Sequence, residues 1–329
     1  YILKANIKPV IMTIFFAFFA IGLSLFPKLE LGLDQRIAVP SDSYLVNYFD
    51  DFYSFFNVGP PIYFVTSDAN FTSREVQQAL CGRFTTCHEL SLVNIVEQEG
   101  KRSNISYIKN TPASWIDDFF TWLNPDLDEC CLVRKKSDTL EFCPPGSNPR
   151  LCETCYAKHK PAWNVDMSGM PEGEEFMTYF NAWIEAPSDP CPLGGKAPYS
   201  AEVSVEYGNS AIQASKFRSM HVPLRSQDDF INAYLSARRI AKSIEEASGI
   251  NTFAYSPFYI FFAQYVTIIR DSIVLISCAL AAIFLVASFL LGSFQTSLVL
   301  VITVIMIITD IVGIMALWGV NLNAVSLVN

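Results

Sequence analysis

Cysteine supplies the most reactive side chains in this 329-residue chain, and eight of its nine cysteines lie between residues 81 and 191. Cys152-x-x-Cys155, followed by His159, has the residue types of a zinc knuckle or of a redox pair. The other cysteines nearby favour a different interpretation, because small lumenal or secreted domains use many cysteines to form structural disulfides. We therefore expect structural disulfides, and the residues alone leave their pairing open.

Two N-glycosylation sequons lie in the same part of the chain. Asn70-Phe-Thr and Asn104-Ile-Ser each provide an acceptor asparagine. Disulfides persist in oxidising compartments, and N-glycans are added to proteins that enter the secretory pathway. The two features together predict that this region faces an oxidising lumen or the cell exterior.

No group of residues has the spacing of an enzyme active site. His88, His159 and His221 are far apart, and no G-x-S-x-G, H-E-x-x-H or G-x-x-x-x-G-K motif occurs. The aspartate pairs at 50–51, 117–118 and 228–229 are typical of solvated faces or first helical turns. The net charge of −9 argues against a nucleic-acid partner. We therefore expect the chain to have no enzymatic activity and to bind no cofactor and no metal.

Three apolar runs are long enough to cross a membrane as helices, and they lie at Val10–Phe26, Ser272–Leu291 and Leu298–Trp318. We expect the following division of the chain: a cytosolic flank at 1–8, transmembrane helices at 9–27, 266–292 and 298–318, a cysteine-rich lumenal domain at 28–265, and the start of a further, truncated helix at 324–329.

The first apolar run has two interpretations. Lys4 and Lys8 before it, and Ala20 and Gly22 within it, would also suit a signal peptide, although the chain begins with Tyr. The chain returns to the membrane twice, which favours an uncleaved span. With both lysines on the cytosolic side, the next domain is lumenal, in agreement with the cysteines.

Asp310 lies inside the third run, where an ionisable group costs roughly 2.5 to 3.5 kcal/mol to insert. It is a candidate proton or ion site. The alternative is a carboxyl group satisfied by a neighbouring helix, for example by a Ser or Thr side chain. Cys278, in the second run, is expected to be a free thiol.

The lumenal part is predicted to be an α+β domain with two β-α units and a disulfide-rich insertion at 125–200. A short strand is expected at 29–33, and a helix with an aromatic core face follows at 44–56. The remaining elements expected are a strand at 62–65, a helix with a Thr72–Glu75 capping box, helices at 114–123 and 174–184, strands at 201–207 and 212–222, and a helix from Ser226 to Gly249.

Several segments, in order along the chain, resemble the Niemann-Pick type C1 family of resistance-nodulation-division (RND) transporters. They are LGLDQ from Leu31 with PSDSYL from Pro40, PASWIDDF from Pro112, FYIFFAQY from Phe258 and LNAVSLVN from Leu322. The double cysteine at 130–131 and the placement of the spans agree with this resemblance.

The resemblance implies a ferredoxin-like RND porter domain, namely the C-terminal lumenal domain of the family, with flanking spans. It also implies four disulfides: Cys81–Cys87, Cys130–Cys191, Cys131–Cys155 and Cys143–Cys152. In the RND plan the proton-relay carboxylate lies on the helix that begins near Ala324. Asp310 is on the preceding helix, so the resemblance gives it no relay role.

The family moves sterol, cholesterol or ergosterol, from the lysosomal, late endosomal or vacuolar lumen toward the membrane. The resemblance thus implies that this domain forms one wall of a sterol tunnel. Expected partners are sterol, the membrane, the middle lumenal domain and other helices of the same protein, and a small lumenal sterol carrier, Niemann-Pick type C protein 2.

The alternative to sterol transport is the function of a Patched-like receptor, which recognises a protein ligand. A membrane-tethered enzyme has no support in the sequence.

Overall fold

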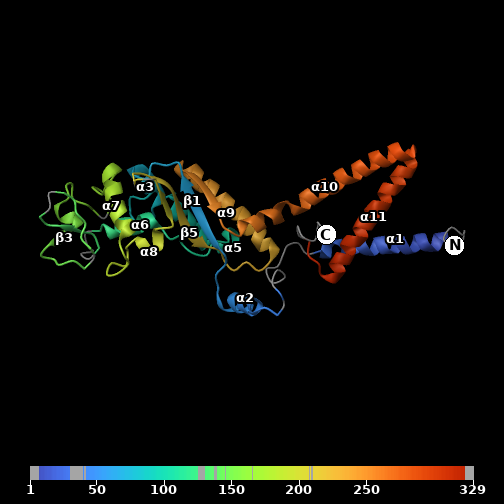
Figure 1. The fold of residues 1–329 in the computed structure, drawn as a ribbon, viewed down its shortest axis with the longest axis horizontal. Helices are drawn as coiled ribbons and strands as arrows, with labels where there is room; N and C mark the ends of the chain where they lie inside the picture. Colours follow the sequence, from blue (N-terminus) through green and yellow to red (C-terminus); the bar gives the residue numbers. More distant parts are fainter. Residues whose placement is uncertain are drawn as a thin grey trace. The chain divides into compact units, whose positions relative to one another are not determined.

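The computed structural model describes residues 7–29, 40, 42–124, 130–136, 139–144, 146–164, 166–206, 208 and 210–322. Its elements (Figure 1) are α1 (Lys8–Leu25), η1 (Phe26–Lys28), α2 (Tyr44–Phe55), β1 (Pro61–Ser67), α3 (Arg74–Leu80), α4 (Leu92–Lys101), α5 (Ser103–Ser106), α6 (Trp115–Trp122), β2 (Leu132–Arg134), β3 (Cys152–Thr154), η2 (Cys155–Lys158), α7 (Gly173–Glu185), α8 (Lys196–Tyr199), β4 (Val203–Val205), β5 (Ile212–Met220), α9 (Gln227–Ser248), β6 (Asn251–Tyr255), α10 (Tyr259–Leu291) and α11 (Phe294–Trp318).

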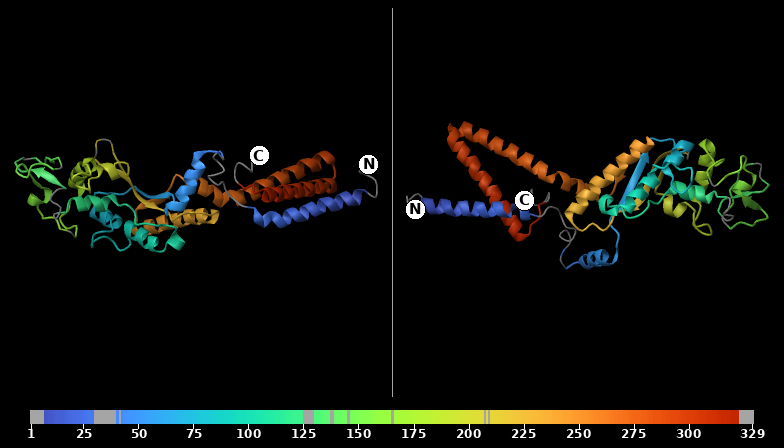
Figure 2. Two further views of the ribbon diagram at one scale, coloured as in Figure 1. Left: turned by 90° about the horizontal axis from the view of Figure 1, so that it is seen from below. Right: turned by 180° about the vertical axis from the view of Figure 1, so that it is seen from behind.

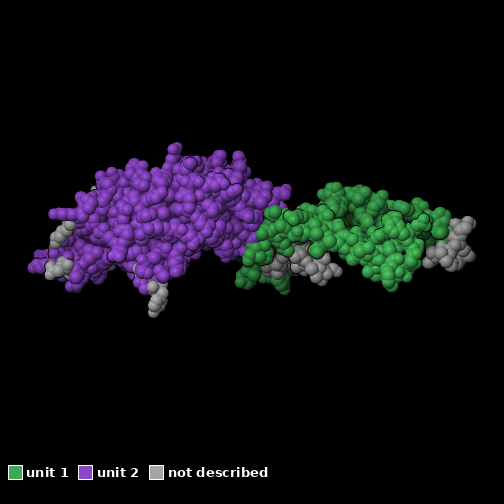
Figure 3. Space-filling model, turned by 90° about the horizontal axis from the view of Figure 1, so that it is seen from above, with its two compact units in different colours: residues 1–56, 260–329 green, residues 57–259 purple. Residues whose placement is uncertain are grey.

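The chain divides into two compact units, which Figure 3 distinguishes by colour. Unit 1 comprises Tyr1–Phe56 and Ile260–Asn329, and unit 2 is Asn57–Tyr259. The mixed α+β unit with four disulfides and the three long apolar helices give the fold class that the sequence predicts.

A four-stranded sheet in the order β4-β5-β1-β6 forms the frame of unit 2. Strand β1 pairs antiparallel with both β5 and β6, so these two strands run parallel to each other. Helix α9 joins β5 to β6 in a split β-α-β arrangement and lies along the sheet (Figure 2). Alternate β1 residues Ile62, Phe64 and Thr66 are fully buried, which is the period of two expected for a strand with one covered face.

Helix α9 shows how local sequence specifies its own boundaries. The Ser226 hydroxyl accepts a hydrogen bond from the Asp229 N–H, and the Asp229 carboxylate accepts one from the Ser226 N–H, so the predicted capping box is confirmed. Gly249 follows the helix in the left-handed region at φ 68°, where a glycine has no steric penalty.

Aromatic side chains fill the space between α6 and α7. Phe119 is fully buried, with its ring centroid 5.1 Å from that of Phe176 and 5.5 Å from that of Trp183. Trp115 meets Phe180 edge to face at 5.5 Å. Such pairs add to the hydrophobic free energy of burying large rings, so this cluster supports the part of unit 2 that carries most of the disulfides.

Helices α1, α10 and α11 are long and apolar enough to cross a membrane. Helix α10 has 33 residues and is about 50 Å long at 1.5 Å per residue, so it exceeds a hydrocarbon core of about 30 Å. It begins at Tyr259, seven residues before the span expected at 266. Helix α11 begins at Phe294, four residues before the span expected at 298.

Two local predictions differ from the structure. Helix α3 is preceded by Ser73, and the Thr72 hydroxyl donates to Asn70 Oδ1, so the predicted Thr72–Glu75 capping box is wrong. Helix α2 forms, yet Tyr44 and Phe55 are 78% and 79% exposed, so these rings are not core. The predicted strand at 29–33 and the helix at 324–329 fall outside the described residues, apart from Leu29.

Candidate functional site

The structure joins the eight cysteines of unit 2 as Cys81–Cys87, Cys130–Cys191, Cys131–Cys155 and Cys143–Cys152, which are the pairs that the resemblance implies. The two cysteines of the C-x-x-C motif bond to different partners, so they do not form a redox pair with each other. His159 contacts Glu175 and the Pro161 carbonyl oxygen at 2.7 and 2.6 Å. These oxygen contacts give it no role as a zinc ligand beside the cysteines.

Peptide mapping without reduction is expected to recover these four pairs, with Cys278 as the free thiol. A digest of the alkylated chain, analysed by mass spectrometry, tests this pairing directly. The control is the same digest after reduction, in which all cross-linked peptides must separate. Alkylation of any of the eight cysteines in the unreduced sample would contradict the assignment.

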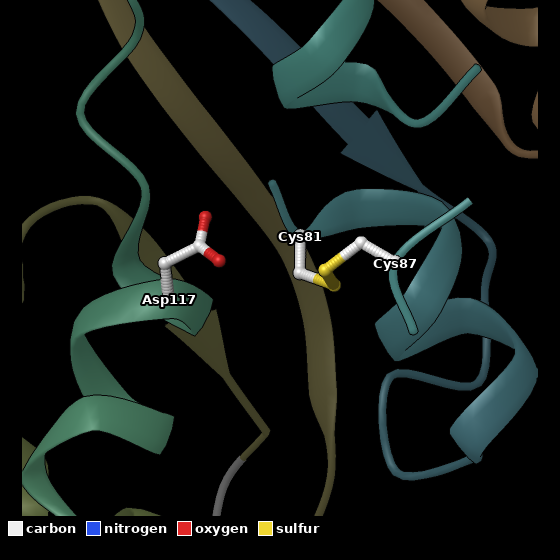
Figure 4. Close-up of side chains that lie close together, drawn as sticks. All are labelled: Cys81, Cys87 and Asp117. Carbon is white, nitrogen blue, oxygen red and sulfur yellow. A yellow bond between two sulfur atoms is a disulfide. The ribbon is translucent and has the colours of Figure 1, made fainter. Parts of the chain in front are cut away.

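A buried carboxylate holds the loop closed by the first disulfide. Asp117, in the first turn of α6, is fully buried and accepts backbone N–H bonds from Gly82 at 3.0 and 3.1 Å and from Arg83 at 3.0 Å. Figure 4 shows this carboxylate beside Cys81 and Cys87. The three residues lie close enough to resemble a metal-ligand set. Because the two sulfurs are bonded to each other, they are not thiolates, and the carboxylate is engaged by backbone amides.

The neighbouring Asp118 has a different set of partners. It pairs with Arg83, and the Tyr199 hydroxyl donates a hydrogen bond to it. Burial, assisted by this carboxylate, raises the pKa of Tyr199, so the phenol stays a proton donor. Residues 117–118 therefore do not form a solvated face, because both carboxylates contact residues that are distant in the sequence, but they do lie in a first helical turn, which was the other predicted setting.

The other predicted aspartate pairs fit their expected settings where the structure describes them. Asp229 belongs to the α9 capping box, and Asp228 is exposed in the same first turn. Asp51 is exposed on α2, and the side chain of Asp50 lies outside the described residues.

Both sequon asparagines are exposed. Asn70 follows β1 and accepts hydrogen bonds from the backbone N–H and the hydroxyl of Thr72. Asn104 is in the short helix α5, where Ser106 is buried and donates to the Glu99 carbonyl oxygen at 2.6 Å. A glycan at either position would project into solvent, so both remain proposed modification sites.

Asp310 lies in unit 1 at a close crossing of α1 and α11. A Cβ at Gly313 would be 2.5 Å from the Gly22 Cα, and a Cβ at Gly22 would be 3.4 Å from Asp310 Oδ1. Glycine at both positions thus lets the two backbones touch, which is a common basis of helix association in membranes. Asp310 Oδ1 is buried without a hydrogen-bond partner among the described residues. Both interpretations of Asp310, a proton or ion site and a carboxyl group satisfied by a neighbouring helix, stay predictions.

One face of the sheet in unit 2 carries accessible aromatic and aliphatic side chains. Tyr63 lies opposite Tyr255, with ring centroids 6.3 Å apart, and Val65 lies opposite Phe253. Phe253 and Tyr255 are each 49% exposed, although both are large and apolar. On the other side of β1, Lys216 places its ammonium group 5.0 Å from the centre of the Tyr63 ring. We call Tyr63, Val65, Phe253 and Tyr255 the open sheet face.

A separate pocket of about 360 Å³ lies beside the N-terminus of α6. Arg83, Arg218, Glu97 and Asp117 contribute to its lining. Charged groups of both signs make this pocket a poor site for an apolar ligand, because burying them against hydrocarbon removes their hydration. The open sheet face is the better candidate for contact with an apolar molecule.

No family model matches the chain. The NPC intracellular cholesterol transporter 1 of Sus scrofa is 35% identical to it over 100% of the chain and 26% of that protein. The NPC1-like intracellular cholesterol transporter 1 is 33% identical in Rattus norvegicus, over 100% of the chain and 25% of that protein, and 30% identical in Homo sapiens, over 98% and 26%. The chain thus spans about a quarter of the length of these relatives. Across the segment that it covers, the chain belongs to the family of NPC1-type proteins.

Proposed function

We propose that the chain takes part in intracellular sterol transport and that its open sheet face lines one wall of an apolar sterol path. The observation that carries the proposal is the full-length match of this chain to proteins named as cholesterol transporters. The open sheet face supports the finer statement, because it leaves Phe253 and Tyr255 half exposed on a sheet otherwise built around a buried core.

An apolar wall suits this cargo for a simple physical reason. Removing hydrocarbon from water is favourable by about 25 cal/mol for each Å² of apolar surface, so a sterol gains free energy along a face of aromatic and aliphatic side chains. Tyr63 and Tyr255 also offer hydroxyl groups that can bond to a sterol hydroxyl without a charge being buried. Lys216, set over the Tyr63 ring, lies at the border of the face.

The proposal includes a setting and partners. The disulfides and the exposed sequon asparagines support a lumenal location for unit 2, and we place it in a lysosomal, late endosomal or vacuolar membrane protein. The opposite wall would come from the middle lumenal domain of the same protein. Sterol would be delivered by a small lumenal carrier, Niemann-Pick type C protein 2.

Photo-crosslinking with a diazirine sterol in the full-length protein tests the path. We expect labelled peptides to include residues 61–67 and 251–255. Replacing Phe253 or Tyr255 with Asp should lower labelling of this face and slow sterol export at least several-fold, because a buried charge opposes the apolar cargo. The matched control is Leu235→Asp, which changes an exposed leucine of α9 outside the open sheet face.

Labelling confined to other lumenal domains would contradict a path along this face. A Patched-like receptor would give a different result, in which changes to exposed loops abolish binding of a protein ligand while sterol export stays unchanged. Equal effects of Phe253→Asp and Leu235→Asp would indicate that the charge acts through general destabilisation and would also count against the proposal.

A further inference from the structure

His221 lies at the end of β5 in a tight junction of four segments. Its backbone N–H donates to the Pro60 carbonyl oxygen at 3.0 Å, and its carbonyl oxygen accepts from the Gly59 N–H at 2.8 Å. A Cβ at Gly59 would be 2.1 Å from the Val222 carbonyl oxygen, so this approach requires glycine. His221 also bridges to Ile108, which follows α5. The backbone of His221 is therefore held on both sides, and the residue is fully buried.

The two ring nitrogens have partners that assign the tautomer. Nδ1 is 2.8 Å from the Tyr107 carbonyl oxygen, which can only accept, so Nδ1 carries the proton. Nε2 is then an acceptor, and the Tyr259 hydroxyl at 2.8 Å must be the donor. Tyr259 is the first residue of α10 and is itself buried. The hydrogen bond thus runs from the beginning of a candidate membrane helix to the end of a strand.

Protonation would reverse the polarity of this contact. A second proton on His221 would make Nε2 a donor that faces the Tyr259 O–H, so the hydroxyl would have to turn its hydrogen elsewhere. The group behind it is the Tyr234 ring of α9, packed edge to face at 5.2 Å. From the remaining segments His221 meets backbone groups of Tyr107, Gly59 and Pro60. Among the described residues no carboxylate contacts the ring, so an imidazolium would be buried without a counter-ion.

We propose that His221 and Tyr259 form a proton-sensitive joint, in which the neutral imidazole holds the first residue of α10 against the end of β5. The joint stays closed while His221 is neutral and is weakened when a proton enters. It makes the attachment of Tyr259 to the end of β5 depend on pH, and it does not depend on whether the open sheet face binds sterol.

Hydrogen exchange of the whole chain in lipid nanodiscs tests the joint. The amides of Tyr259, His221 and Val222 all donate backbone hydrogen bonds at this junction. Their protection factors are expected to fall about a hundredfold between pH 6.5 and pH 4, because opening exposes an imidazole that then takes up a proton. Tyr259→Phe should lower this protection about tenfold at pH 6.5, the effect of one buried hydrogen bond. The matched control is Tyr234→Phe, which removes the hydroxyl of the neighbouring ring, a group that contacts Arg238 and not His221, and should change protection less than twofold.

A pH-independent protection factor in the unmodified chain, or equal protection in Tyr259→Phe and Tyr234→Phe, would overturn the proposal. A second measurement needs no variant. The chain has three histidines, so ring ¹⁵N resonances can be assigned, and His221 should show the Nδ1–H tautomer at pH 6.5. A proton on Nε2 would exclude the donation from Tyr259 and with it the joint.

Discussion

Replacing Asp117 with alanine is expected to lower the free energy of unfolding of unit 2 by about 3 kcal/mol, one of the two largest effects that we expect. The carboxylate accepts three hydrogen bonds from the Gly82 and Arg83 amides and is fully buried. Hydrogen bonds to charged groups contribute roughly 1.5 to 3 kcal/mol each to the free energy of unfolding. In the alanine variant, hydration of the freed amides offsets part of this loss. Denaturant unfolding of the purified chain with intact disulfides measures the change.

The loop at Asp117 also depends on close packing. A Cβ at Gly82 would be 2.3 Å from Val93 Cγ1, so the backbone reaches the carboxylate only because residue 82 is glycine. Asp117→Asn retains one carbonyl acceptor and should cost about half as much as alanine. Asp228→Ala, at an exposed first-turn position of α9, is the control and should cost under about 1 kcal/mol. Equal losses for Asp117→Ala and Asp228→Ala would show that the carboxylate does not hold this loop.

The sequence predicts correctly those helices and strands that are specified by residues adjacent to one another in the chain. Helix α9 has its capping box and its final glycine within the same stretch that forms the helix, so its boundaries follow from adjacent residues. Strand β1 is rich in β-branched and aromatic residues, whereas β5 has only Ile212 and Phe217 of these types and was still predicted at 212–222. The five-residue strand β6 was not predicted, because it is short and its pairing with β1 joins residues almost 200 positions apart.

The candidate sites were harder to predict because their partners are distant in the chain. Asp117 sits in a first helical turn, where carboxylates are usually solvated, and only the fold brings the 82–83 amides to it. The spacing of α2 shows that its aromatic residues share a face, but periodicity does not show what packs on that face. His221 has no motif around it, and its role depends on Tyr107 and Tyr259.

The stability of unit 2 is expected to fall by about 3 kcal/mol between pH 6.5 and pH 4 through His221 alone. Burial, opposed in part by the hydrogen bond to the Tyr107 carbonyl oxygen, lowers the pKa of His221 from 6.5 to about 4. Between these values the unfolded imidazole binds a proton and the folded one does not, so acidification favours unfolding. The slope is about 1.4 kcal/mol per pH unit, and it vanishes below the folded pKa.

Comparison of variants isolates this contribution from that of the carboxylates. His221→Gln should be less stable than the unmodified chain at pH 6.5, because its hydrogen bonds are altered. The difference between the two proteins should shrink by about 3 kcal/mol at pH 4, since glutamine does not titrate. Tyr259→Phe leaves the imidazole buried and should keep most of the pH slope while losing stability at every pH. Parallel curves for the unmodified chain and His221→Gln would contradict a buried neutral imidazole, because burial alone requires the slope.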